Sequence, residues 1–224
     1  MLPLLLYQFT YQTYPKHLIE LIILDDSTTP LSHELNDIIS TDSRVKYHYS
    51  FHKDPLWIKR NKLNDLSTGD IIVWMDDDDI YFNTYIEHVV ILLNKQLSKQ
   101  VACCRKTLLY YPNDNNNNLY VINNKISNHS LAYKKSFLKN HSYKETKHNF
   151  NEEFLFLDHY NVPVVNLNPW YSCIHTCHGN NTVSKESFKY KARKFDKSII
   201  DVCKDIYVID FIKQHLKKNQ DYTS

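Results

Sequence analysis

Four consecutive aspartates, Asp76–Asp79, follow directly on an apolar run, Ile71–Met75. A second acidic pair, Asp25–Asp26, ends another largely apolar run, Leu18–Leu24. Carboxylates this close repel one another, so some must take up protons unless a cation binds among them. Oxygen ligands of this kind suit Mg²⁺ or Mn²⁺, which commonly hold one or two protein carboxylates and complete their coordination with substrate phosphates. The sequence therefore predicts a metal site, with a solvated polar turn as the alternative.

The two apolar runs have the composition of buried parallel strands. In an open α/β sheet, ligands bind beyond the carboxyl ends of the strands. If both runs are parallel strands, the two acidic groups face the same edge of one sheet. This placement favours a single shared site over two unrelated turns.

The elements that must position these residues alternate between helix and strand up to about Lys99. Such alternation predicts an α/β sheet with crossover helices. Asn83 is expected to cap the last helix of this portion. The expected helices are 2–12, 30–39, 55–69 and 83–99, and the expected strands are 18–24, 45–49 and 70–75.

The portion after residue 99 has a different pattern, with short strands and a turn at Pro112–Asn118. We expect one domain, 1–224, with two halves, 1–99 and 100–224. Asp196 is expected to cap a long closing helix. The expected strands are 101–104, 106–111, 119–122, 162–167 and 170–176; a strand enters a short helix over 130–138, and helices cover 151–160 and 196–218.

Composition limits the class of protein. The 224 residues carry a formal net charge of +2, which gives no basic field for nucleic acid. The five cysteines are an odd number without a regular framework, which indicates reduced thiols. No segment approaches the ~18 apolar residues of a membrane span, and the apolar run Leu2–Leu6 lacks the basic leader of a signal peptide. We expect a soluble, cytoplasmic protein with no nucleic-acid partner and no membrane span.

Two segments, "QTYPKHLIELIILDDS" and "IKRNKLNDLSTGDIIVWMDDDDIY", resemble glycosyltransferase family 2. Five features occur in the family's order: Q-x-Y-P, an acidic pair after a strand, R-N on a helix, a Gly-acid step and an aspartate cluster. The resemblance covers about Leu2 to Phe82 and is weaker beyond. The sequence of these segments also resembles a branch of the family found in large DNA viruses. The resemblance implies the GT-A fold, a Rossmann-like, mostly parallel sheet flanked by helices. Residues 1–99 would then be the nucleotide-sugar-binding half, and residues 100–224 a mixed acceptor-side half.

The resemblance also implies residue roles in the first half. Asp25 and Asp26 match the pair that contacts the nucleoside. Arg60 matches a basic residue near the diphosphate, the alternative being an ordinary exposed helix arginine. Asp76 and Asp78 match the D-x-D pair, whose second member commonly holds the metal while the first reaches the ribose or sugar. Asp79 resembles an additional acid that often follows, and it either joins the site or caps the next turn.

In the second half, "FNEEFLFL" resembles the family's glutamate-aspartate motif. Glu153 stands at the place of the aspartate that takes the acceptor's proton, with Glu152 beside it. A glutamate there moves the carboxylate outward by one methylene. The alternative is that both glutamates stabilise a helix N-terminus.

"CHGNNTVSK" resembles a late family segment that closes over the phosphates, which makes His178 a candidate metal ligand. An alternative zinc interpretation takes Cys173, His175, Cys177 and His178 together. These four lie within six residues, whereas structural zinc usually draws on two separated pairs.

Together these observations predict a metal-dependent glycosyltransferase using Mn²⁺ or Mg²⁺. The resemblance implies that it would move a sugar from a nucleotide-diphospho-sugar, a UDP-sugar by default, to a hydroxyl of a carbohydrate or protein acceptor, with inversion. The resemblance also implies a first strand in the middle of the sheet, which has no counterpart here because Met1 falls inside the following helix. That difference motivates a second hypothesis, a non-catalytic or decayed nucleotide-sugar-binding paralogue. A nucleotidyltransferase is a weaker third hypothesis, because no Gly-rich phosphate loop supports it.

Overall fold

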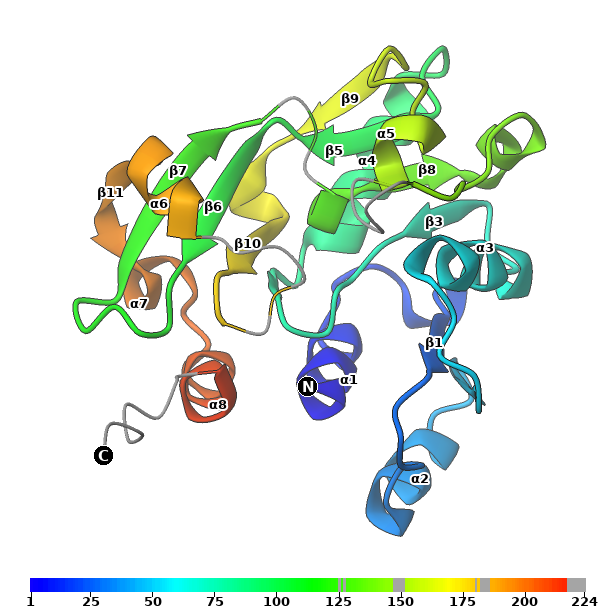
Figure 1. Ribbon diagram of the computed structural model, residues 1–224, viewed down its shortest axis with the longest axis horizontal. Helices are drawn as coiled ribbons and strands as arrows, with labels where there is room; N and C mark the ends of the chain where they lie inside the picture. Colours follow the sequence, from blue (N-terminus) through cyan, green and yellow to red (C-terminus); the bar gives the residue numbers. More distant parts are fainter. Residues whose placement is uncertain (125, 127, 147–151, 180, 182–185, 217–224) are drawn as a thin grey trace.

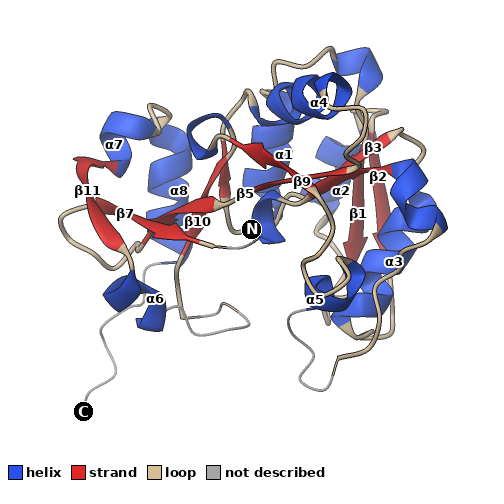
Figure 2. Ribbon diagram, turned by 90° about the horizontal axis from the view of Figure 1, so that it is seen from above, coloured by secondary structure: helices blue, strands red, loops and turns tan. Residues whose placement is uncertain are grey.

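The protein is described from a computed structural model that covers residues 1–124, 126, 128–146, 152–179, 181 and 186–216 (Figure 1). Within these residues the strands form three sheets, of two, four and five strands. Helices lie between and around them, as the second view shows (Figure 2). The α/β fold is confirmed, and its sheets are mixed rather than mostly parallel, because most of the strand pairs are antiparallel.

The two-stranded sheet pairs β1 (Leu21–Asp25) with β2 (Val45–Tyr49) in parallel. The connection contains α2 (His33–Ser40), whose N-terminus is capped by Ser32 through a bond from the Leu35 amide, 3.4 Å. Both strands and α2 lie where the hydrophobic pattern predicts them. Every residue of β1 and β2 is only partly buried. This unit is therefore less enclosed than a central strand pair.

The four-stranded sheet has the order β3-β8-β5-β9, in which only β5 and β9 are parallel. Alternate side chains of its strands enter two different cores, as a period of two requires. On one face Ala102 and Cys104 pack with the helix α4, and on the other Val101 and Cys103 pack with Phe156. The bounds are β3 (Ile71–Val73), β8 (Ala132–Lys134), β5 (Val101–Cys104), β9 (Val164–Leu167) and α4 (Tyr85–Lys95).

The five-stranded sheet has the order β11-β7-β6-β10-β4. The predicted turn joins β6 to β7 as a hairpin, in which Asn117 takes a left-handed conformation, φ 53°, that suits asparagine. Leu108 and Ile174 of this sheet pack with α1 and α8, which lie side by side in Figure 1. The bounds are β4 (Ile80–Tyr81), β6 (Lys106–Tyr110), β7 (Asn118–Asn123), β10 (Cys173–Thr176), β11 (Arg193–Ser198), α1 (Leu2–Thr10) and α8 (Ile206–Leu216).

The helix α1 holds the turn that follows β3 through two buried glutamines, Gln8 and Gln12. The amide nitrogen of Gln8 donates to the Asp79 carbonyl, 3.0 Å, and its oxygen accepts from the Tyr81 amide, 2.6 Å. One helical turn later, the amide nitrogen of Gln12 donates to the Phe82 carbonyl, 3.1 Å. Residues four apart lie on the same face of a helix, so one helix face satisfies this stretch of backbone.

The remaining elements include α3, which packs against β1, and α5, which is shorter than expected. The helix α5 ends before residues 158–160, because these residues have positive φ angles and cannot continue a right-handed helix. The bounds are α3 (Leu56–Leu66), α5 (Glu152–Phe156), α6 (Glu186–Lys191), α7 (Ile199–Val202), η1 (Lys16–Leu18), η2 (Asn128–Ser130), η3 (Lys135–Lys139) and η4 (Pro169–Tyr171).

Two expectations about helix ends are wrong. The long closing helix is instead the strand β11 followed by two helices, because β11 pairs with β7. Asp196 lies in that strand, and the N-cap of α7 is Ser198. Ser198 and Asp201 form a capping box, in which the side chain of each accepts a hydrogen bond from the backbone amide of the other. Asn83 does not cap α4, since the helix begins after Thr84 and has no side-chain cap.

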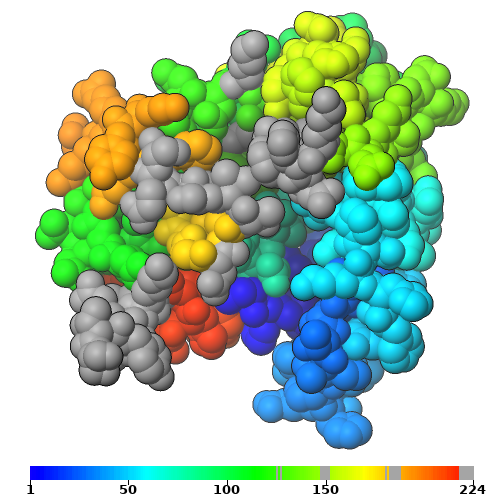
Figure 3. All heavy atoms as spheres, in the orientation of Figure 1, coloured from blue at the N-terminus to red at the C-terminus, as the bar shows by residue number. Residues whose placement is uncertain are grey.

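No strand of the described chain joins β1 to β3, where the resemblance implies a central strand. A cavity of about 1490 Å³ lies there instead, with apolar walls that include Ile22, Leu24, Ile71 and Val73. The β1–β2 unit with α2 projects at the lower right of the space-filling view (Figure 3). Side chains hold it in place. Glu20, just before β1, accepts hydrogen bonds from the backbone amides of residues 68 and 69 at 2.6 and 3.2 Å.

Candidate functional site

The same cavity extends to the acidic residues singled out by the sequence. Asp25 and Asp26 lie at the end of β1, and Asp76–Asp78 lie in the loop after β3; all of them line it. Arg60 of α3 and the two glutamates of α5 complete this polar part. The structure thus brings candidates from four separate elements to one concave surface, the usual form of a small-molecule site.

The carboxylates after β1 are satisfied by the chain itself. Asp25 accepts from the Tyr47 hydroxyl at 2.6 Å and from the Ser27 amide at 2.9 Å. Burial alone would raise the pKa of Asp25, but these hydrogen bonds outweigh burial and lower it. Asp26 forms an ion pair with Lys59, 2.9 Å. Both side chains are held at the cavity's edge by contacts within the chain.

Asp79 points into the protein rather than capping a turn. It is fully buried, and its Oδ1 accepts from the Thr176 amide at 2.8 Å. Its Oδ2 lies 2.9 Å from Nδ1 of His175, which comes from β10. The carboxylate therefore fixes the strand and the imidazole together. This contact joins the loop after β3 to the five-stranded sheet.

Asp76 is held through its backbone. Its amide donates to the Tyr81 hydroxyl at 2.8 Å, and that hydroxyl donates to the His129 carbonyl at 2.9 Å. Burial raises the pKa of Asp76 to about 7; the Arg60 charge opposes the rise, and the charges of Asp79 and Asp78 add to it. Asp77, by contrast, is exposed.

Asp78 meets His178, which lies 100 residues further along the chain. Asp78 Oδ2 and His178 Nε2 are 2.9 Å apart. Asn181 holds the histidine by accepting from its amide at 2.7 Å, and its own amide nitrogen is 3.0 Å from Nε2. Burial favours a raised pKa for Asp78, but the contact with His178 outweighs burial and lowers it. Asn180 and Thr182 of the same sequence segment lie outside the described residues.

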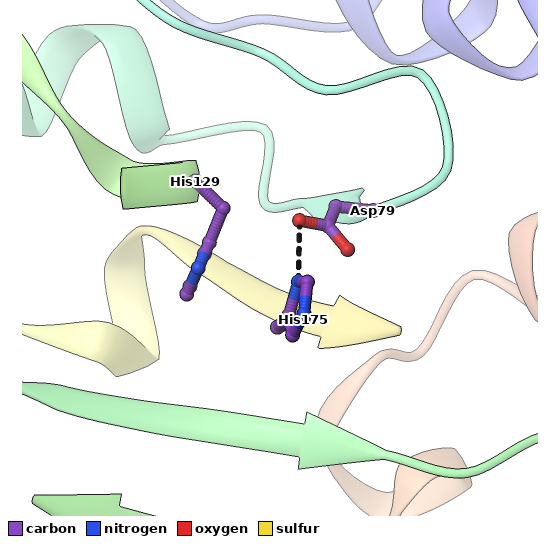
Figure 4. Close-up of side chains that lie close together, drawn as sticks. All are labelled: Asp79, His129 and His175. Carbon is purple, nitrogen blue, oxygen red and sulfur yellow. Dashed lines mark hydrogen bonds and ion pairs between the residues drawn. The ribbon is translucent and has the colours of Figure 1, made fainter. Parts of the chain in front are cut away.

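A second group of potential metal ligands consists of Asp79, His129 and His175 (Figure 4). Their ligand atoms all lie within 4.8 Å of one another. The two imidazole rings are stacked, with centroids 4.8 Å apart and planes 18° apart. Carboxylate and imidazole together suit Mn²⁺ or Zn²⁺ as well as other divalent metals.

The zinc quartet considered from the sequence does not assemble. Cys173 packs in the core beside α4, and Cys177 packs in a separate cluster with Leu109 and Tyr111. His175 turns to Asp79 and His178 to Asp78. Within the described chain the metal-ligand group around His175 contains no cysteine.

Arg60 of α3, which also lines the cavity, forms a buried ion pair with Glu152, 2.7 Å. The side chains are only 7% and 5% exposed, so Arg60 is not an ordinary exposed helix arginine. Its guanidinium lies over the rings of Trp74 and Tyr143, 4.6 and 5.5 Å from their centroids. The Asn128 side chain also approaches Glu152, at 3.4 Å. Glu152 is thus neutralised within the protein.

Glu153 differs from its neighbour because no cation pairs with it in the described chain. It is buried, and its Oε1 accepts from the Tyr160 hydroxyl at 2.9 Å. Burial raises the pKa of Glu153, and the negative charge of Glu152 adds to the rise. A carboxyl with a raised pKa that faces a cavity is suited to proton transfer near neutral pH.

The comparisons with known proteins agree with this geometry. The family model described as "Glycosyl transferase family 2" matches residues 4–157, which is more than half of the chain. The chain belongs to glycosyl transferase family 2. No curated protein matches it. The resemblance stated from the sequence motifs is confirmed.

Solved structures similar to this family member include those of S. aureus TarS. TarS 1–349 matches with a TM-score of 0.58 and 14% identity, over 76% of this chain and 55% of that chain. The same fragment in complex with UDP-GlcNAc matches with a TM-score of 0.57 and 14% identity, over 83% of this chain and 58% of that one. The complex with UDP gives a TM-score of 0.55 and 14% identity, over 95% and 61%. The chain therefore spans less than two thirds of these TarS chains, and the likeness shows the fold.

Two residues of the family member's site were not found from the sequence as partners of Asp79. His129 lies in "SNHS", which carries no motif, and His175 was considered only for zinc. No local sequence pattern connects these histidines to Asp79, because they lie 50 and 96 residues from it in the chain and meet it only in the folded structure.

In the described part of the chain no helix has the length and apolar character needed to cross a membrane.

Proposed function

We propose that this protein transfers a sugar from a UDP-sugar to an acceptor hydroxyl, with a divalent metal at Asp78 and inversion at the sugar. The observation that carries this proposal is the charge of the loop after β3. Asp76–Asp79 form no ion pair with lysine or arginine in the described residues; Asp78 and Asp79 pair only with histidines. Such a cluster calls for a cation from outside. The donor class is supported by family membership and by TarS complexes with UDP-GlcNAc and UDP.

The residues present fit a divalent cation. Asp78 Oδ2 and His178 Nε2 face each other at 2.9 Å beside the cavity. Asp76 adds a second carboxylate from the same loop, and Asp79 with its two histidines offers a neighbouring set. When bound, the metal would neutralise the diphosphate and so stabilise the departing nucleotide. Asp25 and Asp26, at the end of β1, would contact the nucleoside.

Glu153 is the proposed base. It takes the proton of the acceptor hydroxyl as that oxygen forms a bond to the anomeric carbon. The bond between this carbon and the diphosphate oxygen breaks at the same time, and its electron pair leaves with UDP. Attack from the face opposite the leaving group inverts the configuration. Arg60 holds Glu152 beside the base through the ion pair, and its positive charge lies near the cavity.

The test is turnover of UDP-GlcNAc with Mn²⁺, measured as UDP release, in the parent and in Asp78→Asn. A neutral amide cannot offset the cation's charge, so we expect a loss of about a hundredfold or more. Asp65→Asn is the matched control, because Asp65 is exposed on α3 and does not line the cavity. Equal activity of Asp78→Asn and the parent would show that the proposed metal position is wrong.

A second candidate is a protein that binds nucleotide-sugar without turning it over. The observation that favours it is the separate β1–β2 sheet, which leaves the nucleoside side of the cavity without a central strand. Calorimetry distinguishes the two. UDP binding without any release of UDP from UDP-GlcNAc would support the second candidate, and release would support the first.

A further inference from the structure

Three consecutive residues after α5, Asp158, His159 and Tyr160, have left-handed φ angles of 49°, 57° and 64°. None of them is glycine, so each conformation is sterically unfavourable. Strained backbone of this kind persists only where surrounding contacts hold it, and it concentrates at functional sites.

The surrounding contacts are clear. The His159 amide donates to the Phe154 carbonyl at 2.7 Å, and the Leu157 amide donates to the Glu153 carbonyl at 2.9 Å. The Phe154 ring meets the rings of His159 and Tyr160 edge-on, at 4.6 and 5.3 Å. These bonds reverse the chain onto the helix that carries the candidate base.

The reversal returns one side chain to Glu153. The Tyr160 hydroxyl donates to Oε1 of Glu153 at 2.9 Å, and both residues line the cavity. A continuous helix would carry residue 160 almost two turns away from residue 153, about 10 Å along the axis. The left-handed turn is therefore what allows the contact.

We propose that Tyr160 is a positioning residue for the base Glu153, an inference that rests on the proposed function. By donating to Oε1 it fixes the orientation of the carboxyl group and directs Oε2 to take the acceptor's proton. It also stabilises the charged form, which keeps the base ionised although it is buried.

Among the described residues, burial has the largest effect on the pKa of Glu153 and raises it. The charge of Glu152 adds to the rise, while the Tyr160 hydroxyl and the Arg60 charge lower it. Arg60 is already paired with Glu152. Removing the Tyr160 hydroxyl deletes a donor to the charged form, so the pKa of Glu153 must rise.

The experiment compares Tyr160→Phe with Tyr120→Phe. Tyr120 also donates to a carboxylate, Asp114, at the same 2.9 Å, but it does not line the cavity. For Tyr160→Phe we expect the acidic limb of the kcat profile to move to higher pH, with kcat falling about three- to tenfold at pH 6. The KM for UDP-GlcNAc should stay unchanged, because Tyr160 acts on the base. Tyr120→Phe should reproduce the parent profile.

A direct readout separates this proposal from the function on which it rests. The carboxyl of Glu153 is titrated by ¹³C NMR in glutamate-labelled protein, with Glu153→Gln to assign the signal. A higher midpoint in Tyr160→Phe supports the positioning role even if the parent turns over no donor, in which case only the proposed function fails. Unchanged titration of Glu153, or kcat profiles of the parent and Tyr160→Phe that coincide, would overturn the role of Tyr160.

Discussion

The two sides of the cavity neutralise their carboxylates in different ways. On the side of β1 and α3, Glu20, Asp26 and Glu152 each have a cation from the chain: Lys46 at 2.6 Å, Lys59 at 2.9 Å and Arg60 at 2.7 Å. On the side of the loop after β3, Asp78 and Asp79 have only histidines. Asp78 and Asp79 therefore have no lysine or arginine partner in the described chain, which supports the external cation proposed above.

Glu20 and Asp76 differ in the same way in their pKa values, whereas Asp78 differs from Asp76 because its contact with His178 lowers its pKa. Burial would raise the pKa of Glu20, but hydrogen bonds from Lys46 and Thr68 outweigh burial and lower it to about 2. Burial raises the pKa of Asp76 to about 7. The charged form of Glu20 therefore stabilises the fold, whereas the buried charge of Asp76 destabilises it, and a bound cation would offset that cost. The comparison therefore separates carboxylates that pair with a lysine or arginine of the chain from those at which we propose a metal.

The largest expected effect breaks the buried pair on the first side. Arg60→Met leaves Glu152 buried and without its cation, which should cost about 3–5 kcal/mol of unfolding free energy. Urea unfolding measures this. Lys62→Met is the matched control, because Lys62 pairs with Asp54 while 48% exposed, and an exposed pair contributes about 1 kcal/mol or less.

A double variant sharpens the result. If the loss comes from the uncompensated charge, Arg60→Met with Glu152→Leu should regain much of it. A loss under 1 kcal/mol in the single variant would contradict the view that Glu152 depends on Arg60.

A smaller effect concerns Glu20, which ties β1 to the start of β3. Glu20→Gln should cost roughly 1–2 kcal/mol at pH 7, since it weakens hydrogen bonds to a charged group. The folded pKa of about 2 lies below the unfolded value, so the stabilisation is present above about pH 4.3 and is lost as pH falls toward 2.

Thermal melting between pH 7 and pH 2 tests this sign. The parent should lose its advantage over Glu20→Gln as the pH falls, while Glu34→Gln, an exposed control on α2, should track the parent. A gap that stayed constant across the whole range would mean that Glu20 does not act through its charge.

The sequence predicted those parts of the fold whose signals are local. β1, β2 and α3 have clear hydrophobic periodicity and punctuation, and they lie where the patterns indicate. The strand β11 could not be recognised, because "RKFDKS" adopts a strand only through its pairing with β7, more than 70 residues away. Tertiary pairing overrode local propensity there.

The site shows the same limit. The motifs indicated Asp25, Asp78 and Glu153, and the structure places all three on one cavity. The partners were not predictable, since Arg60 and Glu152 are 92 residues apart and His175 and Asp79 are 96 apart. A motif identifies a chemical group at one position, whereas the residue that pairs with this group depends on the tertiary fold.

The smallest expected effect lies within the aspartate run itself. Asp77 lines the cavity like its two neighbours, but it is exposed, and the described structure gives it no ion pair. Asp77→Asn should therefore change the melting midpoint by little, and the slight change should be upward, because it removes one of several like charges. Mn²⁺ should raise the midpoint of the parent and of Asp77→Asn alike, by binding to the folded state.

Asp78→Asn supplies the contrast in the same melting series. Asp78 is the carboxylate that meets His178 at 2.9 Å, so its amide variant should lose the response to Mn²⁺ while Asp77→Asn keeps it. The two substitutions remove the same charge one residue apart, which excludes net charge as the cause of any difference. An equal response to Mn²⁺ in the parent and both variants would mean that the loop after β3 needs no external cation, and the division between the two sides of the cavity would fail.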